Sequence, residues 1–167
     1  MNNLAVEKSS FSLKIQLEII SWLITALVTY MVIYPLISHF AIFQFLGTNI
    51  FFVVIFITYS RYIFLFKHSF LADFQWIKFG LIFLSLPLGW YLVENLQNFQ
   101  IFLDDEGLGS FEKHFNEGVD YEQKQTIIGY MRREMMFFGT SAIIAAFLLP
   151  FRLLISFWRV HNGTGRV

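Results

Sequence analysis

A long stretch without charge limits what this chain can fold into. Between Glu18 and Arg61 there are 42 residues without a single Asp, Glu, Lys or Arg. A helix needs about 20 apolar residues to cross a bilayer core of roughly 30 Å, so this stretch holds two spans and a turn. Soluble domains carry about 25% charged residues, whereas this chain carries 14% and has 22 phenylalanines. The sequence therefore predicts an all-α, polytopic integral membrane protein.

Charge and hydropathy together predict four transmembrane helices packed as a bundle. The predicted spans are residues 19–38, 50–66, 77–93 and 135–158. The first apolar run is longer than the core of a secretory signal peptide, so we expect it to be an uncleaved anchor. The apolar segment 39–46 is too short for a span, and we expect it to lie in the interface or to lengthen the second helix.

The distribution of basic residues predicts the orientation of the spans. With four spans, both termini and the middle loop lie on one side. That side carries eight basic residues, namely Lys8, Lys14, Arg61, Lys67, Lys78, Arg152, Arg159 and Arg166. The other side carries four, namely Lys113, Lys124, Arg132 and Arg133. Because cytoplasmic loops are enriched in Lys and Arg, we expect a multi-pass protein of the inner or plasma membrane with cytoplasmic ends 1–18 and 159–167.

The loop 94–134 is the longest polar segment, and we expect it to be acidic, extracytoplasmic and partly helical. Apolar residues at helical spacing indicate that the third helix continues to Asp104, with Gly107 near its C-cap. Asp120 followed by Gln123 is a capping-box variant that predicts the start of the fourth helix. The sequence therefore predicts a helical cap that packs over the bundle.

Several kinds of chemistry lack the residues that they require. The chain has no cysteine, and it contains no nucleophile-elbow, zinc-protease or phosphate-loop motif. The acidic run Asp104-Asp105-Glu106 does not have the alternating spacing of a calcium loop. The four histidines (His39, His68, His114 and His161) form no pair at one depth that could ligate haem. We predict no catalytic residue, no cofactor and no metal site, and the zero net charge predicts no nucleic-acid binding.

Three charged residues near the cytoplasmic boundary form a candidate contact site. Arg61 precedes Lys67 by six residues and Arg152 precedes Arg159 by seven, which places both arginines about 9–10 Å inside that boundary. Glu18 is the nearest acid by depth. We expect Arg61 and Arg152 to share one anion, which is Glu18, a lipid phosphate or a carboxylate of a partner. The alternative is that each arginine extends separately to the headgroups.

Small residues at four-residue spacing predict where the helices pack closely. They are Gly139, Ser141, Ala142, Ala145 and Ala146 in the fourth span, and Ser85 and Gly89 in the third. The second span is rich in phenylalanine and has almost no small residue. We therefore expect the second span to face lipid or a partner protein.

The absence of charge from most of the spans guides the functional prediction. Ion transporters and pumps place ionisable groups inside the membrane, but 19–38, 80–93 and 135–151 contain none. We predict a non-catalytic protein, a small accessory or scaffold subunit that contacts lipids and other membrane subunits or self-associates. One alternative is a small oligomeric channel or transporter for a neutral or lipidic solute, with Thr25, Thr29 and Ser85 along its path. Another is a lipid-modifying enzyme in which the outer acids converge with Arg132 and Arg133.

Overall fold

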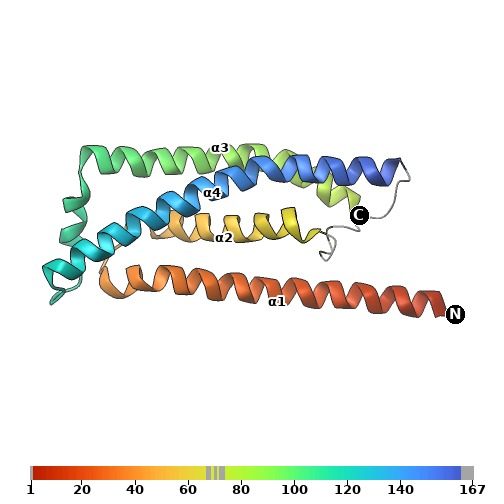
Figure 1. Ribbon diagram of the computed structural model, residues 1–167, viewed down its shortest axis with the longest axis horizontal. Helices are drawn as coiled ribbons and strands as arrows, with labels where there is room; N and C mark the ends of the chain where they lie inside the picture. Colours follow the sequence, from red (N-terminus) through yellow and green to blue (C-terminus); the bar gives the residue numbers. More distant parts are fainter. Residues whose placement is uncertain (1, 67–68, 70, 72–73, 163–167) are drawn as a thin grey trace.

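Figure 1 shows a computed structural model of the chain, which describes residues 2–66, 69, 71 and 74–162. Four long helices run side by side, and a short 3₁₀ helix connects the last two. They are α1 (Asn2–His39), α2 (Leu46–Phe64), α3 (Gln75–Asp105), η3 (Leu108–His114) and α4 (Tyr121–His161). Each long helix is long and apolar enough to cross a membrane. This confirms the predicted all-α bundle with four spans.

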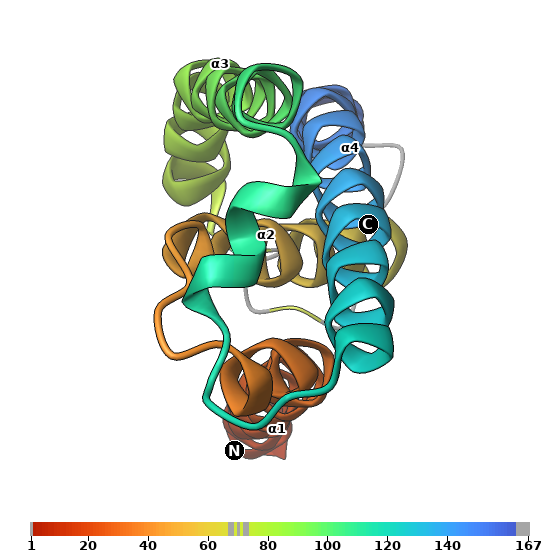
Figure 2. The ribbon, with the colours of Figure 1, turned by 90° about the vertical axis from the view of Figure 1, so that its left-hand side faces the viewer.

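The helix α2 lies at the centre of the bundle, with α1 on one side and α3 and α4 on the other (Figure 2). Phe52 and Val53 are completely buried, and Phe51 and Phe56 are partly buried against the core. The prediction that this phenylalanine-rich helix faces lipid or a partner is therefore wrong for Phe52, whereas Phe64, at the end of the helix, is 82% exposed. The large rings fill the space between three other helices, which a helix with small residues would leave empty.

The small residues of α3 and α4 lie mostly on buried faces of these helices. Ser85, Gly89, Ala142, Ala145 and Ala146 are buried, and Ser141 is half-buried. A Cβ on Gly89 would lie 3.5 Å from the ring of Phe147 and 3.8 Å from Cβ of Ala146, which is ordinary contact. A Cβ on Gly139 would lie 2.8 Å from Leu96 Cδ1 and 3.1 Å from the ring of Phe52. An alanine at position 139 would therefore force the Leu96 side chain and the Phe52 ring to shift.

The loop between α3 and α4 closes one end of the bundle, where η3 crosses the end of α2 (Figure 2). Gly107, with φ +72, ends the α3 region, and α4 begins directly after Asp120. Phe111 is buried, and its ring lies within 6.4 Å of four other rings, those of Phe40, Phe43, Phe45 and Phe102. These five phenylalanines form what we call the aromatic cap.

Residues 40–45 connect α1 to α2, supply three phenylalanines of this cap and are not helical. Phe40 and Phe43 are buried, the N–H of Ala41 donates to the carbonyl of His114 at 2.8 Å, and the N–H of Asn116 donates to that of His39 at 2.9 Å. The segment therefore does not lengthen α2. It is only partly buried, since Ala41, Ile42 and Gln44 are exposed, and its place in the membrane interface stays a prediction. Backbone hydrogen bonds join it to the loop between α3 and α4, which also contributes a ring to the aromatic cap.

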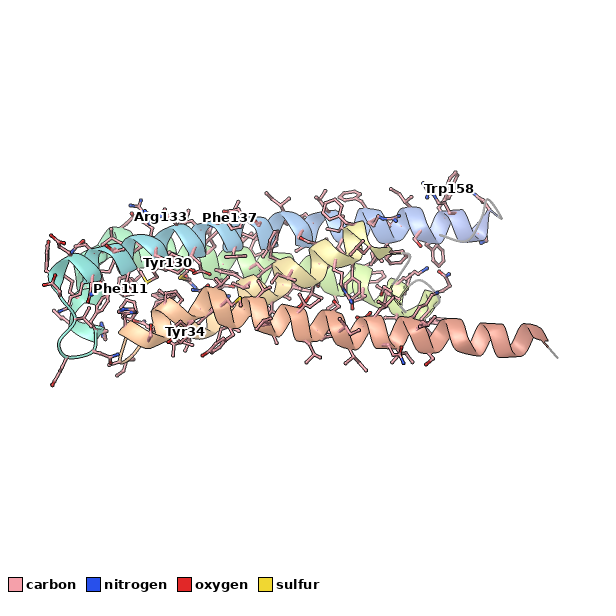
Figure 3. The ribbon with its side chains drawn as sticks, turned by 60° about the horizontal axis from the view of Figure 1, so that its bottom comes forward. Tyr34, Phe111, Tyr130, Arg133, Phe137 and Trp158 are labelled. Atoms are coloured by element: carbon pink, nitrogen blue, oxygen red, sulfur yellow. The ribbon has the colours of Figure 1, made fainter. Side chains whose placement is uncertain are left out.

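The helix α1 contacts the bundle along a narrow line of side chains. The buried positions are Glu18, Thr25, Thr29, Ile33 and Leu36, and the side chains between them are mostly exposed and apolar. The first turns of α1 and the last turns of α4 lie at the end of the bundle opposite the aromatic cap (Figure 1). Trp158 is 63% exposed at that end, far from Phe111 (Figure 3). We call the two ends the terminal end and the cap end.

Candidate functional site

Polar side chains inside the bundle lie at two depths. Near the terminal end, Glu18 of α1 meets Arg61 and Tyr62 of α2. Nearer the cap end, Asn49 of α2 meets Glu134 of α4. At a rise of 1.5 Å per residue, Asn49 and Arg61 lie about 18 Å apart along α2. We call these groups the terminal site and the cap-side site.

At the terminal site, Glu18 receives several donors. The guanidinium of Arg61 forms an ion pair with its carboxylate, and the hydroxyl of Tyr62 donates to the same oxygen at 2.8 Å. The hydroxyl of Ser69 lies 3.5 Å from the other oxygen. Arg61 also lies 4.5 Å from the centroid of the Tyr62 ring. These contacts satisfy the carboxylate and connect α1 to α2.

Arg152 contacts a different group. Its Nε donates to the backbone carbonyl of Ile63 at 3.2 Å, and its guanidinium lies 5.4 Å from the centroid of the Phe66 ring. Ile63 belongs to the last turn of α2, whose carbonyls have no partner within the helix. A cation is favourable there because the C-terminal end of a helix carries partial negative charge. The structure thus brings Arg61 to Glu18 and gives Arg152 a separate role at the end of α2.

Lys78 also lies inside the bundle, although its sequence position indicated only a basic residue on the cytoplasmic side. Its side chain has no exposed surface, its Nζ donates to the hydroxyl of Ser156 at 3.2 Å, and it lies 5.1 Å from the centroid of the Phe66 ring. Lys78 is in the first turn of α3 and Ser156 is near the end of α4. The contact therefore connects the terminal ends of these two helices.

At the cap-side site, an amide and a carboxyl group are buried together. The Nδ2 of Asn49 donates to Oε2 of Glu134 at 2.5 Å. Asn49 has no exposed surface and Glu134 is 6% exposed. One turn nearer the cap, the hydroxyl of Tyr130 donates to the carbonyl of Val32 at 2.8 Å, on the side of α4 that faces α1 (Figure 3).

Sequence reasoning missed Glu134 as a site residue because it directly precedes the predicted fourth span. A signal was available in the spacing. Glu134 follows Met131 by three residues and precedes Phe138 by four, so it lies on the same helix face as these apolar side chains. Arg132 and Arg133, by contrast, are exposed, and so are Glu94 and Asp104.

Residues able to hold a transition metal do not gather anywhere in the described part of the chain, where no three His, Asp or Glu side chains form a suitable group. His39 and His114 lie at the cap end and His161 lies at the terminal end. His68 falls outside the described residues. The hydroxyls of Thr25 and Ser85 donate to backbone carbonyls of their own helices, at 2.9 and 2.8 Å.

A groove opens between α3 and α4 at the terminal end. It has a volume of about 470 Å³ and is lined by Gln75, Trp76, Phe79, Phe157 and His161. Its walls are mostly aromatic, and two polar side chains lie among them. Such a groove can hold an apolar chain with a polar group at one end.

No protein-family model, curated protein or solved structure matches this chain. Its function is therefore inferred from its own side chains.

Proposed function

We propose that this protein is a non-catalytic accessory or scaffold subunit of a membrane complex. The observation that carries this proposal is the use of the charged groups within the bundle. Arg61 pairs with Glu18 across two helices, and Arg152 bonds a carbonyl at the end of α2. Charged groups that hold a protein's own helices together are not available to a substrate.

The interior between the terminal site and the cap-side site also supports this proposal. Most of the buried side chains there are apolar, and five of them have no more than 1% exposed surface, namely Phe52, Leu92, Ala142, Ala146 and Leu149; Thr58 is a buried polar exception. A solute crossing a single copy would need polar groups along its path. A packed apolar interior fits a structural role better.

The wide apolar face of α1 is the best candidate for contact with another subunit. It carries exposed large side chains along its length, including Leu23, Leu27 and Met31, which are 55–65% exposed. Lipids cover such a face by default, whereas a partner helix would cover it at defined positions. The partner we expect is another membrane subunit or a second copy of this chain.

A photoreactive amino acid introduced at single positions distinguishes contact with lipid from contact with a partner helix in cells that produce the full chain. Positions 23, 27 and 31 of α1 are compared with Phe83 and Trp90, which are equally exposed on α3. We expect the α1 positions to cross-link to one protein of defined mass and the α3 positions to give lipid adducts. Lipid adducts alone from both helices would contradict the proposal.

We also propose that the terminal end faces the cytoplasm of a cell bounded by this membrane, because the sequence assigns eight of the twelve basic residues to that side. The chain has no cysteine, so a single introduced thiol reports its own location. Ser110→Cys should react with an impermeant maleimide in intact cells, and Asn162→Cys should react only after permeabilisation. The reverse pattern would invert the proposed topology.

The groove at the terminal end favours one alternative function, a small oligomeric transporter for a neutral or lipidic solute. Trp76 and Phe157 offer apolar walls, and Gln75 and His161 offer polar groups at the same place. Reconstituted vesicles containing a fluorescent phospholipid test this alternative. Movement of the label between leaflets that Phe157→Ala abolishes would favour the transporter over the scaffold subunit.

A further inference from the structure

Glu134 has fewer partners than its burial requires. Its Oε2 accepts from Asn49, but its Oε1 is buried with no hydrogen-bond partner among the described residues. The Oδ1 of Asn49 is buried and unpartnered in the same part of the chain. Buried polar atoms without partners are costly, so these two oxygens require a partner that the described part of the chain does not supply.

Glu134 has fewer hydrogen-bond donors around it than the other buried acid, Glu18. Both acids lie inside the bundle, but Glu18 has a guanidinium, a phenolic hydroxyl and a serine hydroxyl around it. Glu134 has one neutral amide, and no Lys or Arg pairs with it within the described residues. The leftover oxygen of Asn49 can only accept, and so can that of Glu134 when the acid is ionised. The missing partner must therefore supply positive charge or donate hydrogen bonds.

The helix register brings a third oxygen to the same depth. The contact between Tyr130 and Val32 sets the register of α4 against α1, which run antiparallel. Glu134 lies about one helical turn from Tyr130, and Thr29 lies about one turn from Val32. Both are on the side of this contact that is nearer the terminal end. Thr29 is 8% exposed and thus faces the bundle.

The hydroxyl of Thr29 differs from that of its neighbour Thr25. Thr25, one turn away on the same helix, donates its hydroxyl to the carbonyl of Ser21, as buried helical threonines commonly do. The Oγ1 of Thr29 is buried and has no partner among the described residues. Three helices thus each present an unsatisfied oxygen at one depth.

We propose that Glu134, Asn49 and Thr29 form a buried binding site for one small monovalent cation, for which sodium is the test ion. A carboxylate, an amide carbonyl and a hydroxyl are hard oxygen ligands, which suit alkali cations. The site carries a single carboxylate, so one positive charge balances it. A bound ion would join α1, α2 and α4 near the cap end, where α1 otherwise has only its narrow line of contacts. This binding activity is additional to the proposed scaffold role.

Thermal unfolding of the purified full chain in detergent tests the site without any substitution. At equal ionic strength, the chain should melt at least about 3 °C higher in sodium chloride than in choline chloride. Equilibrium binding of radioactive sodium should approach one ion per chain. If the chain melts at the same temperature in both salts and binds no sodium, water or a proton satisfies these oxygens and the proposal is wrong.

Two substitutions identify the ligands. Glu134→Gln removes the charge but keeps the shape of the side chain and an acceptor for Asn49, and it should abolish both the sodium-dependent shift and the binding. Thr29→Val should weaken sodium binding about tenfold or more, because it removes one ligand and keeps the volume. Glu94→Gln is the matched control, since Glu94 is an exposed acid of α3. A shift that is lost equally in the control would be a general salt effect and would overturn the site.

Discussion

Replacing the ion pair at the terminal site should reveal how α1 is held on the bundle. We consider Glu18→Leu, Arg61→Leu and the double variant, since leucine fills part of the space without polar atoms. The Glu18 side chain is 11% exposed and that of Arg61 is 16% exposed, so either charge left alone would be largely out of water. The single variants therefore each leave one buried charge uncompensated, whereas the double variant leaves none.

The single variants should lose much more stability than the double variant. Breaking a buried pair by removing one partner costs about 3–5 kcal/mol, whereas replacing both partners with apolar groups is often neutral. The double variant still loses an acceptor for Tyr62, which costs about 1 kcal/mol or somewhat more. At about 2–4 °C per kcal/mol for a chain of this length, each single variant should melt about 6–20 °C lower. The double variant should lie between the single variants and the original chain.

Differential scanning fluorimetry in one detergent measures all four chains, and its order of melting temperatures is the decisive readout. Recovery in the double variant would show that the two side chains depend on each other. If both single variants melt within about 2 °C of the original chain, the pair is screened by solvent and contributes like a surface ion pair. That result would refute the view that the pair holds α1 in place.

Three further predictions concern packing at other places in the fold. Gly139→Ala should destabilise the chain by about 1–2 kcal/mol in denaturant titrations, because its Cβ would lie 2.8 Å from Leu96, whereas Gly89→Ala should be neutral or stabilising; equal effects would contradict this. Phe111→Ala should speed hydrogen exchange in η3 and in residues 40–45 while the spans stay protected, and unchanged exchange would mean that the aromatic cap holds without this ring. Tyr130→Phe should cost about 1 kcal/mol in the same titrations, and no loss would show that its hydrogen bond to α1 has no net value.

The sequence was sufficient to predict the class of fold and most of the helix ends. Charge-free runs predicted four spans, because a bilayer core excludes unpaired charge. Gly107 predicted the end of α3, which ends at Asp105, and Asp120 predicted the start of α4, which begins at Tyr121. Such signals are local in the chain, so they can be found without knowledge of its neighbours.

The position of α2 could not be predicted in the same way. Its phenylalanines are as suitable for lipid as for a protein interior, since both surroundings are apolar. Composition alone therefore does not distinguish a central helix from a peripheral one. The helices that pack against α2 determine its position, and Gly139 of α4 makes room for the ring of Phe52.

The two buried acids show a similar limit. Glu18 and Arg61 could be matched by depth, because both lie near a boundary marked by other charges. Asn49 and Glu134 are 85 positions apart, and their meeting depends on the parallel register of α2 and α4. The sequence shows that Glu134 lies on an apolar helix face but not which side chain meets it.

The aromatic cap has a consequence for how the protein assembles. It takes Phe40, Phe43 and Phe45 from the loop of one helical hairpin, and Phe102 and Phe111 from the second hairpin. The cap cannot close until the loops of both hairpins are in place. Its closure therefore joins the first half of the chain to the second, at a point where neither hairpin could bury these rings alone.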